Sequence, residues 1–162
     1  MKIKSGTLAI VLVVLVFGGI FASDIAGLWK TEASKTAGII EKGSSAGEKD
    51  PEDIKGSFSF LDISNNYNIP VSELEKAFQI KNVESIESFK AKDLESYYGE
   101  NIDKEIGASS IRLFVALYKG VEFEITEEIY LPEAAVKILK EKGEIEKENL
   151  EYIEKNTVKI LN

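Results

Sequence analysis

The N-terminal segment constrains the fold of this chain more than any other. Between Ser5 and Ser23, nineteen consecutive residues carry no charge, and the only charged side chains before them are Lys2 and Lys4. At about 1.5 Å per helical residue, this run is just long enough to cross a hydrocarbon layer about 30 Å thick. The sequence therefore predicts a single transmembrane helix, and we assign residues 5–29 to this anchor and its interfacial end.

The charges that flank the run predict its orientation. Lysines lie on its short side, and Asp24 opens its long side. Because basic residues favour the cytoplasmic side, residues 1–4 are expected to form a cytoplasmic stub and the rest of the chain to lie outside the membrane, with Trp29 among the lipid headgroups. A cleaved signal peptide is the alternative. Its apolar stretch is usually only about 7–15 residues long, so we favour a retained anchor.

The chain after the anchor is strongly acidic. The first 23 residues hold two of the 20 basic residues and none of the 28 acidic ones, which leaves 18 bases against 28 acids and a net charge of −10. Such a surface repels nucleic acid and anionic headgroups. We therefore expect no nucleic acid as partner, and because the chain is anchored, we expect the partner to be a membrane protein.

Residues 30–53 differ in composition from the segments on either side. Small and charged residues prevail, only Ile39 and Ile40 are suited to packing, and the stretch 43–47 reads GSSAG. This composition is typical of a flexible linker. A helical stalk that continues the anchor as far as about Lys42 is the alternative.

Residues 54–162 are expected to form one compact all-α domain. Its first helix has a clear start, because Ser59 followed three residues later by Asp62 matches a capping box. Phe58 and Ile63 occupy the two positions of a hydrophobic staple around that cap. The sequence therefore predicts that the first helix begins at this serine.

A second helix follows closely. Asn68 tolerates the left-handed conformation of a tight turn, and Pro70 suits the first turn of a helix. Residues 59–79 therefore resemble a helix-turn-helix unit. A DNA-reading helix needs basic side chains, but the second helix offers two acids and one base. We interpret the unit as two helices packed at the corner of a core.

The outer face of that second helix is the candidate contact for a protein partner. Its members share a polar character and helical spacing. They are Glu73, Glu75, Lys76 and Gln79. An acidic face of this kind steers a basic partner, so association should be faster at low salt.

The rest of the chain is also predicted to be mostly helical. Apolar residues at helical spacing indicate helices over 90–98 and 109–119, each followed by a glycine, and the second of these should be central. Residues 132–142 and 146–155 are expected to form a C-terminal helical hairpin. Residues 121–125 alternate with period two, and we interpret them as an extended coil because one strand makes no sheet.

Composition narrows the chemistry available to the chain. It contains no histidine and no cysteine, which rules out imidazole and thiolate ligands and the nucleophiles that depend on them. We expect no catalytic, metal or cofactor site, and no enzymatic activity. The acidic run is interpreted as solvated charge. It consists of Glu122, Glu124, Glu127 and Glu128.

The stretch IKGSFSF at 54–60, followed by Ile63, Tyr67, the triplet IPV at 69–71 and Leu74, carries a resemblance. It is similar to a small extracytoplasmic module that occurs with membrane iron–sulfur proteins of the polyferredoxin type and with cytochrome-b-like proteins. The resemblance covers about residues 54–160. It implies an accessory or docking module whose partner carries any redox chemistry.

Two functions remain open at this point. The first is a membrane-anchored extracytoplasmic interaction or accessory module, for instance of a membrane electron-transfer complex. The alternative is a tethered receptor domain that binds a small ligand or peptide in a groove lined by aromatic side chains. The candidate lining residues are Phe58, Phe60, Tyr67, Phe78, Tyr97, Tyr98, Phe114 and Tyr118.

Overall fold

The computed structural model describes residues 35–99, 104–142 and 145–160. Thr36–Asn162 form one compact unit, which is mainly helical, as predicted. Among the described residues, no helix is long and apolar enough to cross a membrane. The predicted stub and anchor, residues 1–29, lie outside the described residues.

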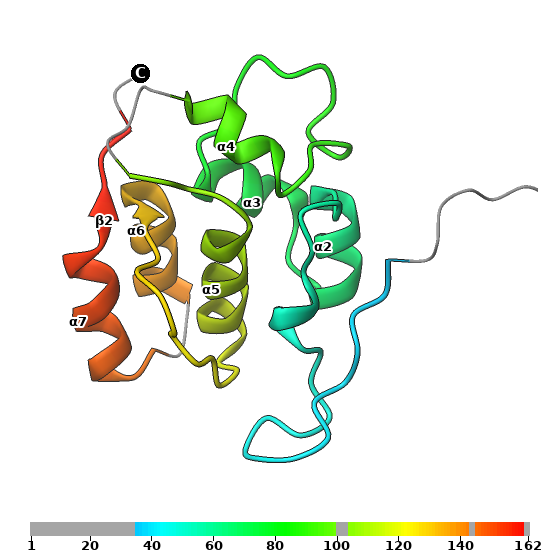
Figure 1. The fold of residues 1–162 in the computed structure, drawn as a ribbon, viewed down its shortest axis with the longest axis vertical. Helices are drawn as coiled ribbons and strands as arrows, with labels where there is room; N and C mark the ends of the chain where they lie inside the picture. Colours follow the sequence, from blue (N-terminus) through cyan, green and yellow to red (C-terminus); the bar gives the residue numbers. More distant parts are fainter. Residues whose placement is uncertain (1–34, 100–103, 143–144, 161–162) are drawn as a thin grey trace, which may run out of the picture. The chain divides into compact units, whose positions relative to one another are not determined.

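The described part of the unit contains six α-helices, one short 3₁₀ helix and one pair of very short strands (Figure 1). In chain order, these are η1 (Pro51–Asp53), α2 (Phe60–Tyr67), α3 (Val71–Ala77), α4 (Asp93–Tyr98), α5 (Ala108–Lys119), β1 (Leu131–Pro132), α6 (Glu133–Lys142), α7 (Lys147–Lys155) and β2 (Thr157–Val158).

Helix α2 begins with the capping box that the sequence predicts. The Asp62 N–H donates to Ser59 Oγ over 3.1 Å, and the Ser59 N–H donates to Asp62 Oδ2 over 2.7 Å. The helix ends at Asn68, which is left-handed with φ 55°. Pro70 then stands at the N-cap of α3. These local signals were enough to place the helix-turn-helix unit correctly.

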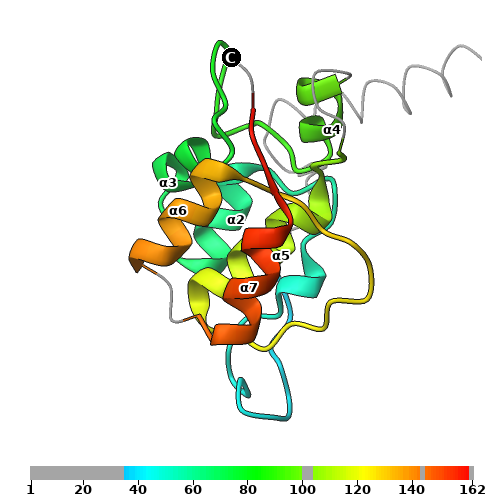
Figure 2. The ribbon, with the colours of Figure 1, turned by 90° about the vertical axis from the view of Figure 1, so that its left-hand side faces the viewer.

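Helix α5 is central, as predicted. Figures 1 and 2 show it in the middle of the unit, with α6 and α7 on one side and η1 and α2 on the other. Apart from Arg112, all its residues between Ser110 and Leu117 are buried. The helix ends at Gly120, whose φ of 64° is left-handed, as a glycine C-cap allows.

The aromatic side chains form the centre of the core. Phe78 lies between Phe60 and Phe114, with ring centroids 6.2 and 5.6 Å apart, and Phe89 packs edge-on against Phe60 at 5.4 Å. Six of the eight aromatic residues considered as groove lining are buried. These rings therefore fill the interior, as such residues do in most helical domains, and do not line an open groove.

The compact unit begins at Thr36 rather than at Ile54, so the predicted linker needs a correction. Residues 36–53, which we call the strap, belong to the unit. Ala37 is only 1% exposed, and its N–H donates to the Asn66 side chain of α2 over 2.8 Å. Long-range contacts of this kind leave no trace in local composition, which is why the segment reads as a linker.

Further polar contacts hold the strap. The Tyr67 hydroxyl donates to the carbonyl oxygen of Asp50 over 2.7 Å. Lys49 Nζ donates to the carbonyl oxygen of Ala37 over 2.6 Å. An isolated antiparallel bridge pairs Ile39 with Lys49. Residues 39–49 thus form a closed loop, here called the strap loop.

The C-terminal hairpin closes the unit. Leu139 of α6 and Ile153 of α7 are buried. Strands β1 and β2 are parallel, with Leu131 opposite Thr157. This pairing was not predicted, because two-residue strands leave no periodic signal. The segment 121–125 is extended without pairing in a sheet, as expected.

Candidate functional site

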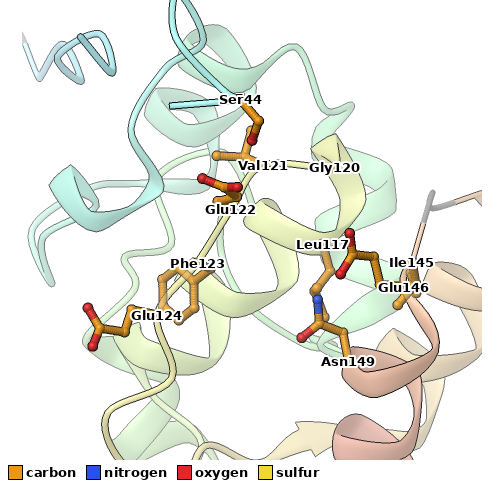
Figure 3. A pocket seen from close by; sticks show the side chains of 10 residues that line it. All are labelled: Ser44, Leu117, Gly120, Val121, Glu122, Phe123, Glu124, Ile145, Glu146 and Asn149. Carbon is orange, nitrogen blue, oxygen red and sulfur yellow. The ribbon is translucent and has the colours of Figure 1, made fainter. Parts of the chain in front are cut away.

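An open groove of about 870 Å³ lies beside the C-terminal end of α5 (Figure 3). Its lining comes from the strap loop, the end of α5, the extended segment 121–124 and the start of α7. We call it the acidic groove. The lining residues are Ser44, Leu117, Gly120, Val121, Glu122, Phe123, Glu124, Ile145, Glu146 and Asn149.

One side of the groove is shaped by the end of α5. The left-handed Gly120 turns the chain, and the N–H of Val121 donates to the carbonyl oxygen of Ala116 over 2.9 Å. The chain then runs extended, so successive side chains point to opposite faces. Val121 is buried, whereas Glu122 and Glu124 are exposed.

The other side of the groove is formed by residues that begin α7. Glu146 is the N-cap residue of that helix, and Asn149 lies in its first turn. Figure 3 shows these side chains and Ile145 near Leu117 of α5, across from Ser44 and Glu122. The groove therefore has carboxylates on both of its sides, and apolar side chains, among them Leu117 and Phe123, also line it.

The electrostatics of the groove favour a cation. Glu122, Glu124 and Glu146 are exposed, and among the described residues the lining includes no lysine or arginine. The C-terminal end of α5 adds the partial negative charge of its helix dipole. Within the described ranges, no three acidic side chains converge as metal ligands. The spread of the carboxylates suits a lysine or arginine whose aliphatic stem packs on the apolar side chains of the lining.

The predicted contact face on α3 is less open than expected. Lys76 is exposed, but the side chain of Glu73 is only 12% exposed and lies 3.7 Å from the Lys76 ammonium. Gln79 follows the helix end with a left-handed φ of 49° and is half-buried. None of these residues lines the acidic groove.

Glu75, also on the predicted face, borders a second hollow of about 410 Å³. The loop 80–87 between α3 and α4 forms the rest of its lining. The Tyr97 hydroxyl accepts a hydrogen bond from the Lys81 N–H over 2.9 Å, which attaches this loop to α4. Its charged lining residues are three glutamates, Glu75, Glu84 and Glu87, and one lysine, Lys81.

The four glutamates of the acidic run do not act alike. Glu127 accepts from Ser109 Oγ over 2.8 Å, and Glu128 accepts from the Tyr130 hydroxyl over 2.7 Å. Glu122 and Glu124 instead line the groove. Their alternation with apolar residues was visible in the sequence. Their proximity to α7 was not, because it depends on the tertiary fold.

No family model matches the chain, no curated protein matches it, and no solved structure matches it. The groove, the acidic charge, the N-terminal run and the sequence resemblance are the features that bear on function.

Proposed function

We propose that the chain is a membrane-anchored extracytoplasmic contact module that docks a basic segment of a membrane protein in the acidic groove. The observation that carries this proposal is the combination of carboxylates on both sides with apolar side chains in the same lining. Complementary charge speeds encounter and fixes register, and buried methylene stems add affinity. In this proposal the module works by contact and performs no catalysis.

The membrane part of the proposal rests on the uncharged run and its flanking charges. Because the strap belongs to the compact unit, only residues 24–35 separate the run from that unit. Twelve extended residues span at most about 43 Å. So short a connection favours a partner that is itself at the membrane. Protease added to intact spheroplasts should digest the module and leave a membrane-bound stub, whereas a protected module would contradict this orientation.

The resemblance to modules that accompany membrane iron–sulfur proteins supports an electron-transfer complex as the assembly that contains the partner. The face of α3 is the second proposed contact. There Lys76 is exposed and Glu75 borders the second acidic hollow. The two regions are lined by different residues, so their contributions to binding can be measured separately.

Charge reversal tests the proposal. The groove variant carries Glu122→Lys, Glu124→Lys and Glu146→Lys. A matched control changes three exposed glutamates outside the groove lining to lysine and so has the same net charge. The control positions are Glu52, Glu133 and Glu141.

After mild detergent extraction, we expect the groove variant to lose its co-purifying membrane protein and the control to keep it. Raised salt should weaken the wild-type complex, because it screens exposed charges. Circular dichroism checks that both variants fold. Equal retention of the partner by both variants would contradict docking in the groove, and a Glu75→Lys variant then tests the α3 face.

The second candidate function is a tethered receptor for a small cationic ligand. Its support is the volume of the groove, which falls within the range of small-molecule sites. Calorimetry with a polyamine distinguishes the two functions. Micromolar binding of the polyamine, together with no co-purifying membrane protein, would favour the receptor.

A further inference from the structure

The strap loop contacts the acidic groove through one buried serine. Ser45 is 7% exposed, and its Oγ accepts a hydrogen bond from the N–H of Glu122 over 3.0 Å. The two residues lie 77 positions apart in the sequence. This bond therefore joins the strap to the extended segment that carries two of the groove carboxylates.

The neighbours of Ser45 bring the loop close to the same glutamate. Ser44 lines the groove. A Cβ at Gly43 would lie 3.4 Å from Glu122 Oε2, which is ordinary van der Waals contact. Both the backbone and the side chain of Glu122 thus lie beside the loop, so the loop forms one wall of the groove.

Polar contacts, rather than a large apolar surface, hold this wall. The loop is closed internally by hydrogen bonds from Ile40 N–H to the Glu48 carbonyl and from Gly47 N–H to the Ile40 carbonyl, each 2.9 Å long. Ile39 is 60% exposed. A segment with few buried apolar contacts opens locally at a lower free energy than the core does.

We propose that Ser45 is a positioning residue that holds the strap loop as a wall of the groove, so that loop attachment and occupancy of the groove stabilise each other. This inference rests on the proposed function and takes a lysine-bearing segment of the partner as the occupant. A cation bound beside Glu122 contacts both walls: the extended segment 121–124, which Ser45 holds, and the strap loop, which carries Ser44. By linkage, the occupant strengthens the attachment by the same factor by which the attachment strengthens binding.

The test uses the full chain in nonionic detergent and a synthetic peptide of lysine and alanine as the probe. Ser45→Ala removes the acceptor, Ser45→Thr restores a hydroxyl, and Ser44→Ala is the matched control in the same loop. Two quantities are measured, namely amide hydrogen exchange at Glu122 and the affinity for the peptide. Exchange needs no peptide, so it reports on the attachment by itself.

In Ser45→Ala we expect exchange at Glu122 to be about tenfold faster and peptide affinity about fivefold lower, both restored by threonine and unchanged in Ser44→Ala. The peptide should slow this exchange in the wild type. Unchanged exchange in Ser45→Ala would overturn the attachment. Faster exchange with unchanged affinity would overturn the coupling. A wild type that binds no peptide would instead contradict the proposed function, and the exchange data would then still report whether the serine holds the loop.

Discussion

Arg112 Nε donates a hydrogen bond to the backbone carbonyl oxygen of Ile54 over 2.8 Å. Arg112 is the only arginine of the chain, and Ile54, which follows η1, is fully buried. The bond therefore fixes the end of the strap against the central helix, and helix α5 also packs against η1.

Arg112→Ala should lower the free energy of unfolding by about 1.5–3 kcal/mol, because a hydrogen bond from a charged group is lost and a buried carbonyl loses its partner. Arg112→Lys should retain part of the lost stability, since an ammonium also donates a hydrogen bond but does not reproduce the geometry of the guanidinium. Urea denaturation of the fragment 36–162 measures both. An alanine variant as stable as the exposed control Lys137→Ala would show that the contact contributes nothing.

The capping box gives a second prediction. Ser59→Ala removes the acceptor for the Asp62 N–H at the start of an eight-residue helix. We expect a loss of about 1 kcal/mol in the free energy of unfolding. The exposed Ser57→Ala is the control and should be neutral. Equal midpoints of urea unfolding for the two variants would mean that the cap does not stabilise α2.

The core gives the largest predicted effect. Phe114 is fully buried, and its ring centroid lies 5.6 Å from those of both Phe78 and Tyr118. Phe114→Ala leaves a cavity and should lower the free energy of unfolding by about 3–5 kcal/mol. Leu61→Ala, at a residue 44% exposed, should change it by less than about 0.5 kcal/mol. Similar effects of the two would contradict the central position of α5.

Alkaline pH should destabilise the fold through two tyrosines. Burial raises the pKa of Tyr98 far above its usual value, and the neighbouring Tyr97 raises this pKa further. The Tyr98 hydroxyl also donates to the carbonyl oxygen of Phe78. Burial likewise raises the pKa of Tyr67, helped by neighbouring aspartates.

The sign follows from proton linkage. The unfolded chain releases these protons from about pH 10, while the folded chain retains them. Their stabilising contribution is therefore complete below about pH 10 and is lost as the pH rises further. Tyr98→Phe should reduce the slope of this loss by up to about 1.4 kcal/mol per pH unit. Urea denaturation at several pH values between about 9 and 11.5 measures how the free energy of unfolding depends on pH. A slope in Tyr98→Phe equal to that of the wild type would contradict the raised pKa of Tyr98.

Local signals carried most of the successful sequence predictions. Ser59, Asn68 and Gly120 each act within one helical turn, so their roles are visible without tertiary information. The strap was missed because its bonds join residues far apart, such as Ala37 to Asn66. The groove was missed for the same reason, since its carboxylates come from segments that are distant along the chain.

Site-specific photo-crosslinking in intact membranes tests the central claim most directly. A photoreactive residue in place of Asn149 lies in the groove lining, and one in place of the exposed Glu133 lies outside it. We predict an adduct with one membrane protein from position 149, none from position 133, and loss of the adduct when Glu122, Glu124 and Glu146 are changed to lysine. No adduct from position 149, or one that survives the charge reversal, would contradict docking in the acidic groove.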